Sequence, residues 1–313
     1  MKVLISGGSG FIGSHLCEWF LENGADVWCI DNFLTSNEEN LNNCLNKKNF
    51  VLIKKDVCNL NPEKFKNNFT HILHFASPAS PVDYNKYPVE TMRVNSAGTE
   101  NMIKIALLNN SIFLFSSTSE VYGDPEIPVQ NEEYWGRVNP IGMRSMYDEG
   151  KRFAEALIMA YHRKYGLNSR IIRIFNTYGP RMRINDGRVI PNFITQALTG
   201  KPITIYGDGN QTRSFCYISD LIEGIIKVLN CNYNLPINLG SPEEFTIRQL
   251  AEKIKEITQS NVEIIFKPPL PDDPKRRKPD ITKAKKILNW EPFVKLEEGL
   301  KKTIPYFIKE LKK

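Results

Sequence analysis

The sequence predicts an α/β fold in which a doubly wound parallel sheet is joined to a second, smaller α+β lobe. Three observations support this prediction. The chain begins with a buried strand (residues 2–6), a glycine turn and an amphipathic helix (15–24). Strands and helices then alternate to about residue 176, which is typical of a parallel sheet with helices on its faces. From about residue 177 the segments between strands become irregular and aromatic, which indicates the smaller lobe.

We expect residues 1–176 to form the larger domain, with 214–241 returning to its sheet, and residues 177–213 and 242–313 to form the smaller lobe. The predicted sheet strands are KVLIS (2–6), DVWCID (26–31), FVLIKKDV (50–57), HILHFAS (71–77), IFLFSST (112–118), SRIIRIF (169–175) and PINLG (236–240). In the smaller lobe we expect a hairpin-like stretch over 202–220, a strand over 262–267 and helices over 185–200, 246–259, 281–288 and 296–311.

The composition is that of an ordinary globular protein. Of the 313 residues, 41% are hydrophobic and 24% are charged, and no apolar run approaches the roughly 18 residues of a membrane span. The six cysteines form no CxxC pair, and the four histidines show no ligand spacing with cysteines or acids, so we expect reduced thiols and no metal site. The N-terminus enters a strand directly, without a secretory signal, and we expect a cytoplasmic protein that does not enter a membrane.

The net charge of +6 raises the question of a nucleic-acid partner. The excess is concentrated in KRRK (275–278) and in the lysine-rich C-terminal helix. No aromatic residues interleave with the basic run, and a diphosphate suits such a run as well as a polynucleotide does. We therefore expect no nucleic acid among the partners.

Gly7, Gly10 and Gly13 form a GxxGxxG turn between the first strand and the first helix. Without side chains the backbone can approach a pyrophosphate, and the helix N-terminus offers N–H donors. The second strand ends at Asp31, 18 residues after Gly13, where a carboxylate binds a ribose diol and repels a 2′-phosphate. This Rossmann pattern favours NAD over NADP. The expected cofactor-binding residues here are Gly7, Gly10, Phe11, Ile12, Gly13, Asp31 and Asn32, with Asp56 and Val57 near the adenine ring.

Tyr147 and Lys151 stand one turn apart on the same face of a predicted helix that starts at YDEGK (147–151). An ammonium about 4 Å from the phenol, at an effective dielectric of about 20, is worth roughly 4 kcal/mol and would lower the pKa of the phenol by about 3 units. Tyr147 could then act as a base near neutral pH. Tyr and Lys four residues apart also occur on ordinary solvated helices, so the spacing alone does not decide.

Polar side chains also gather at two predicted strand ends. Thr118, Ser119 and Glu120 follow one strand, and Asn176 follows the next. In a doubly wound sheet ligands bind at the carboxyl ends of the strands, so these residues are well placed for chemistry. A polar strand end that only caps a turn is the alternative interpretation.

The glycine turn, Asp31, the hydroxyl cluster and the YxxxK pair together resemble the extended short-chain dehydrogenase/reductase family over essentially the whole chain. Ser9, where that family often has Ala, and ETMRV (90–94), where it usually has a basic run, depart from the pattern, and the second departure leaves the contacts of that helix open. Longer stretches are similar to one branch of the family, the UDP-glucuronate decarboxylases or UDP-xylose synthases: FASPASP (75–81), STSEVYGDP (117–125), NPIGMRSMYDEGKRFAE (139–155), RIFNTYGPRMRINDGRVIPNFI (173–194), YGDGNQTRSFCYISDL (206–221) and DDPKRRKPDI (272–281).

This resemblance implies roles for the site residues. Thr118 and Tyr147 would hydrogen-bond and deprotonate the sugar 4-hydroxyl, and Lys151 would hold the nicotinamide ribose. Glu120 would lie near C5 and the sugar carboxylate, where it either promotes departure of the carboxylate by repulsion or orders a water that protonates C5. The implied catalytic residues are Thr118, Ser119, Glu120, Tyr147, Lys151 and Arg277, and the implied substrate-binding residues are Asn176, Arg188, Tyr206, Arg213 and Arg277.

The resemblance also implies NAD-dependent decarboxylation of UDP-glucuronate to UDP-xylose through a 4-keto intermediate, with the cofactor recycled. The alternatives are a UDP-glucose 4-epimerase or a nucleotide-sugar 4,6-dehydratase, and an NAD-binding regulator without activity. A dehydratase is expected to have Asp where this chain has Ser119, an epimerase usually lacks Glu120, and an intact Tyr147 and Lys151 argue against the regulator.

The expected partners are a UDP-sugar and a second copy of the chain. The resemblance implies a homodimer held by a four-helix bundle of the helices at 88–109 and 144–164. The periodicity of these helices alone also allows them to be buried against the sheet.

Overall fold

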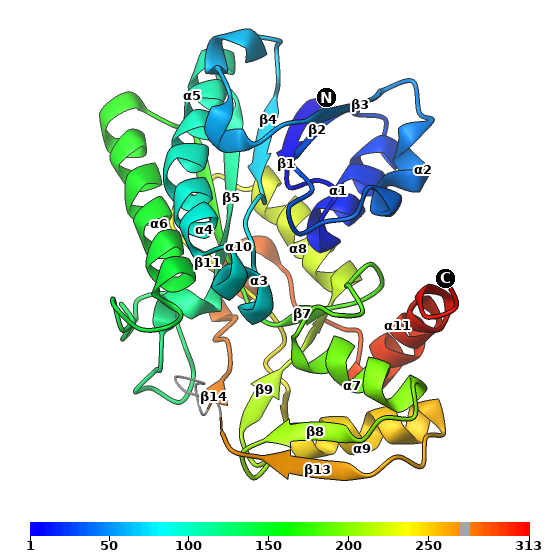
Figure 1. Cartoon of the computed structure of the whole chain (residues 1–313). Coiled ribbons are helices and arrows are strands. Elements are labelled where there is room, and N and C mark those ends of the chain that lie inside the picture. The colour runs from blue at the N-terminus through cyan, green and yellow to red at the C-terminus, as the bar shows by residue number, and fades with distance from the viewer. Residues whose placement is uncertain (270–275) are drawn as a thin grey trace.

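The central feature of the fold is a seven-stranded parallel sheet (Figure 1). The computed structural model describes residues 1–269 and 276–313, so Lys275 of the KRRK run lies outside the described residues. The strand order is β11-β6-β5-β4-β1-β2-β3 and reverses between β1 and β4, which confirms the predicted doubly wound α/β fold. The strands are β1 (Lys2–Ser6), β2 (Asp26–Asp31), β3 (Phe50–Lys54), β4 (His71–His74), β5 (Ile112–Thr118), β6 (Ser169–Ile174) and β11 (Ile237–Leu239).

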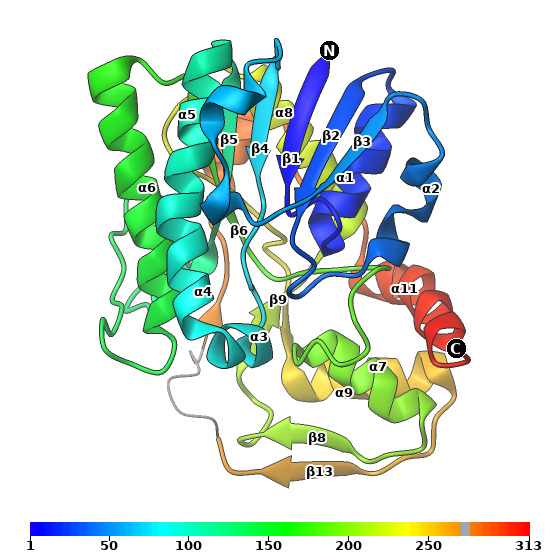
Figure 2. The same ribbon diagram turned by 45° about the horizontal axis from the view of Figure 1, so that its top comes forward.

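Different helices cover the two faces of the sheet (Figures 1 and 2). Val3 and Ile5 of β1 join the core formed with α1 and α8, whereas Leu4 joins the core formed with α5 and α6. Successive strand residues point to opposite faces, so a strand buried on both faces reads as a continuous apolar run. The helices are α1 (Phe11–Glu22), α2 (Asn42–Leu45), α3 (Pro81–Lys86), α4 (Pro88–Arg93), α5 (Thr99–Asn109), α6 (Ser145–Tyr165) and α8 (Ile218–Asn230). A π-helical turn (Val94–Gly98) joins α4 to α5.

Most of the remaining elements lie below the carboxyl edge of this sheet in Figures 1 and 2. They are β7 (Thr177–Tyr178) with β10 (Cys216–Tyr217), β8 (Ile203–Tyr206) with β13 (Ile264–Lys267), β9 (Thr212–Ser214) between β12 (Glu244–Thr246) and β14 (Arg276–Arg277), and the helices α7 (Val189–Leu198), α9 (Ile247–Thr258) and α11 (Leu296–Glu310). The helix α10 (Thr282–Leu288) instead contacts α8 and β11 beside the sheet. Within residues 1–269 and 276–313, no helix is long and apolar enough to span a membrane.

The hairpin expected over residues 202–220 is wrong. β8 and β9 flank a glycine-rich turn but do not pair with each other. β8 pairs in parallel with β13, and β9 pairs antiparallel with β12 and in parallel with β14. These partners come from segments far along the chain, so a local turn signal could not reveal them.

The C-terminal helix α11 packs closely because Gly299 has no side chain. A Cβ atom at this position would lie 2.0 Å from the hydroxyl oxygen of Tyr178 and 2.9 Å from Cδ2 of Tyr217. The buried Tyr178 hydroxyl donates a hydrogen bond to the carbonyl of Leu296, 3.1 Å away in the same helix. The helix is therefore fixed to β7 and β10 by one close contact and one buried hydrogen bond.

We expect Gly299→Ala to lower the free energy of unfolding by at least about 1 kcal/mol. Alanine gains about 1 kcal/mol of helix propensity, but overpacking costs typically about 1 to 3 kcal/mol and a lost buried hydrogen bond about as much again. Denaturant unfolding would measure the change. Lys301→Ala, an exposed position in the same helix, is the control and should change stability by less than about 0.5 kcal/mol. Wild-type stability in Gly299→Ala would contradict the packing described here.

Candidate active site

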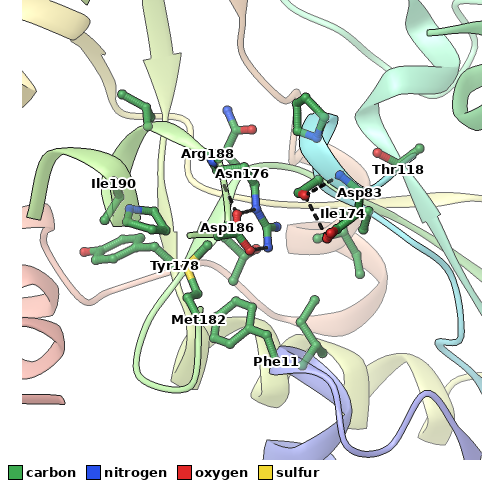
Figure 3. A pocket seen from close by; sticks show the side chains of 18 of the residues that line it. Phe11, Asp83, Thr118, Ile174, Asn176, Tyr178, Met182, Asp186, Arg188 and Ile190 are labelled. Carbon is green, nitrogen blue, oxygen red and sulfur yellow. Dashed lines mark hydrogen bonds and ion pairs between the residues drawn. The ribbon is translucent and has the colours of Figure 1, made fainter. Parts of the chain in front are cut away.

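A cavity of about 380 Å³ lies at the carboxyl ends of the central strands, where the strand order reverses (Figure 3). A smaller cavity adjoins it and shares Gly7 and Gly10 in its lining. The structure thus places every site residue expected from the sequence at one of the two cavities. The larger is lined by Gly7, Gly10, Phe11, Ile12, Gly13, Thr118, Ser119, Glu120, Tyr147, Lys151, Asn176, Arg188, Tyr206, Arg213 and Arg277. The smaller is lined by Asp31, Asn32, Asp56 and Val57.

The glycine turn brings bare backbone to the wall of both cavities. Gly7 has φ +71°, and a Cβ atom there would lie 2.6 Å from the amide nitrogen of Ala76. A Cβ atom at Gly13 would lie 2.1 Å from the carbonyl oxygen of Gly7. The N-cap of α1 is Gly10, which offers no side-chain hydrogen bond to the first N–H groups of the helix. These groups remain available to an anion, so the turn fits a pyrophosphate.

The Asp31 carboxylate is held in a fixed position at the end of β2. It accepts hydrogen bonds from the backbone N–H groups of Ser9 (3.0 Å) and Phe33 (2.9 Å) and from the hydroxyl of Ser36 (2.9 Å). Beside it, the Asn32 amide donates to the Asp56 carboxylate (3.0 Å). The smaller cavity therefore has a negatively charged wall, which suits a ribose diol better than a 2′-phosphate.

Tyr147 and Lys151 both line the larger cavity from the first turns of α6. The ring of Tyr147 stacks on that of Tyr84, with centroids 5.2 Å apart and an interplanar angle of 13°. The Lys151 ammonium lies 5.8 Å from the centre of the Tyr147 ring and donates a hydrogen bond to the carbonyl of Ser116 (2.8 Å). Stacking and this hydrogen bond fix the two side chains relative to the end of β5.

The expectation that Lys151 lowers the pKa of Tyr147 is wrong. Burial raises the pKa of Tyr147 to about 12, although a hydrogen bond with Thr118 and the charge of Arg188 lower it. Burial also lowers the pKa of Lys151 to about 7, so its ammonium is only partly charged at neutral pH. The cost of removing each charged form from water exceeds the attraction that the helical spacing suggested.

Two arginines form ion pairs with Glu120. Arg277 forms a bidentate pair with its carboxylate, with Nη1 2.5 Å from Oε1 and Nη2 2.7 Å from Oε2. Arg144 donates from Nη2 to Oε2 of the same carboxylate. Burial acts to raise the pKa of Glu120, but the charges of Arg277, Arg144 and Arg213 hold it below its usual value. Glu120 is therefore a carboxylate, and Arg277, expected to meet the substrate, holds Glu120 in this structure.

Arg188 is also paired within the protein. Its guanidinium binds the Asp186 carboxylate in a bidentate manner (2.5 and 2.7 Å), and Figure 3 shows both side chains beside Asn176. Nearby, Arg183 forms an ion pair with Asp83 of α3, and both residues line the cavity. The loop that carries Arg188 is thus tied to α3.

The cavity wall also contains residues that the sequence analysis did not name, among them Arg144, Tyr84 and Asp83. Arg144 stands three residues before Tyr147, yet no spacing marks it, because its partner Glu120 comes from the end of β5. Tyr84 and Asp83 lie in the short helix α3, which follows a stretch rich in Pro and Ser and carries no motif that marks a site. Proximity to the YxxxK pair was the one available signal for Arg144.

Comparison with known proteins finds relatives along nearly the whole chain. A family model described as GDP-mannose 4,6 dehydratase matches residues 4–303. UDP-glucuronic acid decarboxylase 1 from Danio rerio is 50% identical over 310 residues, which are 99% of this chain and 73% of the relative. UDP-glucuronic acid decarboxylase 3 from Arabidopsis thaliana is 52% identical over 301 residues, which are 96% of this chain and 87% of the relative.

Solved structures with the same fold include two epimerases. UDP-glucuronic acid 4-epimerase from Bacillus cereus, in complex with UDP-glucuronic acid and NAD, superposes with a TM-score of 0.88 at 31% identity and covers 99% of this chain and 100% of its own. UDP-glucose 4-epimerase from Thermotoga maritima, with UDP-glucose, gives a TM-score of 0.90 at 31% identity, with the same coverage of both chains.

We expect Lys151→Met to change how stability depends on pH. Above about pH 7 Lys151 is mostly neutral in the folded protein, whereas in the unfolded chain it stays protonated to about pH 10. Unfolding then takes up a proton, so the free energy of unfolding of the wild type, relative to Lys151→Met, should rise between about pH 7 and 10 by up to about 1.4 kcal/mol per pH unit.

Denaturant unfolding at several pH values would measure this difference. Lys164→Met, at an exposed position of the same helix, is the matched control and should give no such slope. Parallel stability curves for the wild type and Lys151→Met would show that Lys151 titrates as an ordinary lysine.

Proposed function

Because the chain belongs to the UDP-glucuronic acid decarboxylase family, we propose that it converts UDP-glucuronate to UDP-xylose and carbon dioxide through a 4-keto sugar nucleotide. One observation carries this proposal: Tyr147 and Thr118, which suit chemistry at a sugar hydroxyl, share a cavity with the Glu120–Arg277 pair, which suits a sugar carboxylate. The glycine turn that fits a pyrophosphate borders the same cavity.

NAD is the cofactor that fits the two cavities. Gly7, Gly10 and Gly13 would hold its pyrophosphate at the start of α1, and Asp31 its adenine ribose. Asn32, Asp56 and Val57 line the adenine end, and Phe11 and Ile12 line the larger cavity. When bound, NAD supplies a reversible hydride acceptor, so the overall reaction needs no added reductant.

Tyr147 has two tasks in this proposal. As a phenolate it accepts the proton of the 4-hydroxyl while that carbon is oxidised. Burial raises the pKa of Tyr147 and disfavours the phenolate, whereas the hydrogen bond with Thr118 and the charge of Arg188 favour it. Once carbon dioxide leaves, negative charge collects on O4. Tyr147 and Thr118 are then hydrogen-bond donors to that oxygen, as in an oxyanion hole. Tyr84, stacked on Tyr147, limits the movement of the phenol, so that the same oxygen can accept the proton of the 4-hydroxyl and later donate a hydrogen bond to O4.

Lys151, Ser119 and Asn176 support the bound ligands. Lys151 would hold the nicotinamide ribose from its position beside Ser116. Ser119 and Asn176 line the cavity next to Thr118 and would contact the sugar nucleotide, and Tyr206, Arg188 and Arg213 would contact its nucleotide and diphosphate.

Loss of the carboxylate is the step that separates this reaction from epimerisation. A 4-keto group makes the C6 carboxylate β to a carbonyl, and such an acid loses carbon dioxide readily. Two roles fit the ionised Glu120: its charge promotes departure of the substrate carboxylate, or it orders a water that protonates C5. In both roles Arg277 lies next to the leaving group.

The two solved structures described above are epimerases, so the products must be tested directly. Incubation with UDP-glucuronate and NAD should release carbon dioxide and form a UDP-pentose. A UDP-hexuronate epimer without carbon dioxide would favour an epimerase instead, and no conversion would favour an inactive NAD-binding protein.

We also propose a homodimer in which α4–α5 and α6 pair with their copies as a four-helix bundle. Three large apolar side chains are exposed on these neighbouring helices: Val89 and Met92 on α4 and Phe153 on α6. Burial in a partner would remove this apolar surface from water. We also propose the cytoplasmic location that is expected from the sequence.

We expect Tyr147→Phe to bind UDP-glucuronate but to lose at least about a hundredfold in the rate of carbon dioxide release. Loss of one oxyanion donor costs about 2.7 to 4 kcal/mol in other enzymes, and this variant also loses the base. Tyr165→Phe, an exposed tyrosine of the same helix, is the control and should keep the wild-type rate. Near-normal turnover by Tyr147→Phe would refute the assignment.

We expect Phe153→Glu to convert the dimer to a monomer, because a carboxylate would have to be buried at the bundle. Light scattering coupled to gel filtration would measure the mass. Phe293→Glu, an exposed phenylalanine outside α4, α5 and α6, should leave the mass unchanged. An unchanged mass in Phe153→Glu would place the interface elsewhere or exclude it.

A further inference from the structure

Arg144 occupies an unfavourable position for a cation. It is the N-cap residue of α6, a 21-residue helix, and its carbonyl accepts hydrogen bonds from the N–H groups of Tyr147 (3.0 Å) and Asp148 (3.1 Å). The N-terminus of a helix carries the positive end of the helix dipole, which repels a guanidinium. The sequence therefore places Arg144 where the helix alone would disfavour it, and nearby carboxylates must offset the repulsion.

Two carboxylates offset the repulsion between Arg144 and the N-terminus of α6. The Arg144 guanidinium binds Oε2 of Glu120, and its Nε atom lies 3.9 Å from Oδ2 of Asp148, one turn along α6. Its side chain is only 18% exposed. Arg144 and Glu120 line the larger cavity, whereas Asp148 does not, so Asp148 holds Arg144 from outside the wall. Burial and the charge of Glu120 raise the pKa of Asp148 to about 7, which makes it a weaker competitor for Arg144 than Glu120.

Among the residues that the structure describes, the charges around Glu120 show what Arg144 contributes. Glu120 and Arg277 alone would form a neutral pair, and an incoming sugar carboxylate would have to compete with Glu120 for one guanidinium. At short range in a buried site, repulsion between two carboxylates is strong. With Arg144 bound to Glu120 as well, two cations face Glu120 and the incoming anion, and Arg213 adds to the positive potential at Glu120.

We propose that Arg144 is a positioning residue that determines specificity: by neutralising Glu120 it leaves Arg277 able to receive the carboxylate at C6 of a sugar nucleotide. This inference rests on the proposed function, because it takes the ligand to be a UDP-uronate. Arg144 acts through Glu120 and not through the reacting atoms. It thus favours a uronate over a neutral hexose at the same site.

The test compares two ligands that differ only at C6. Dissociation constants of UDP-glucuronate and UDP-glucose are measured by calorimetry with NAD present, in a Tyr147→Phe background to prevent turnover. Arg144→Gln should weaken binding of UDP-glucuronate at least tenfold and binding of UDP-glucose less than threefold. Arg137→Gln is the matched control, because Arg137 lies on the same loop, is 70% exposed and pairs with Glu126. It should change neither constant.

A second substitution separates charge from structure. Glu120→Gln removes the anion that Arg144 neutralises, so Arg144→Gln in a Glu120→Gln background should weaken UDP-glucuronate less than threefold. Arg144→Lys, which keeps the charge, should retain a preference for UDP-glucuronate over UDP-glucose. Unchanged binding of UDP-glucose reports that each variant is folded.

Three results would overturn the inference: an equal loss for both ligands in Arg144→Gln, an undiminished preference for UDP-glucuronate, or an undiminished effect of Arg144→Gln when Glu120 is replaced. Failure of the proposed function looks different. In that case the wild type releases no carbon dioxide from UDP-glucuronate, while the dependence of uronate binding on Arg144 still stands or falls by the binding constants.

Discussion

The ion pair between Arg277 and Glu120 joins residues that are 157 positions apart, and the sugar end of the cavity depends on it. Arg277 lies on β14, which pairs with β9. In the segment that follows, the carbonyl of Lys278 accepts a hydrogen bond from the backbone N–H of Gln130 (2.9 Å), and the carbonyl of Asp280 accepts one from the side-chain amide of Asn238 on β11 (3.1 Å). Removing one member of a buried ion pair typically costs about 3 to 5 kcal/mol, because the other charge is left without a partner. This part of the cavity wall therefore depends on the contact between two segments that are distant in the sequence.

Much of the larger sheet could be predicted because its signals are local. Apolar strands, a glycine turn and helical periodicity each occupy a few consecutive residues, and the parallel order follows from their alternation. The pairing of β8 with β13 could not be predicted, since it joins segments about 60 residues apart by backbone hydrogen bonds that leave no pattern in either one. The predicted hairpin failed for this reason: a Gly-rich turn reports a change of direction and not the strand that will be paired.

In the candidate site too, residues with a local sequence signal could be predicted, and residues that depend on a distant partner could not. Thr118, Glu120 and Tyr147 follow recognisable strand ends or motifs, and the structure places them around one cavity. Arg144 was missed because its role depends on a carboxylate from another element. The charge states of Lys151 and Tyr147 also could not be predicted from the sequence. Helical spacing predicts that Lys151 and Tyr147 are near each other, but burial sets the pKa of each group, and burial is known only once the sheet, α3 and α6 have packed together.

The sheet also has a consequence for how the chain folds during synthesis. Its last strand, β11, comes from residues 237–239, and α8, which covers one face, comes just before it. Until these residues have left the ribosome, β6 is an unpaired edge strand and part of the apolar face is open to water. Such an edge can pair with another chain, so the nascent protein passes through a long aggregation-prone interval that only late translation ends.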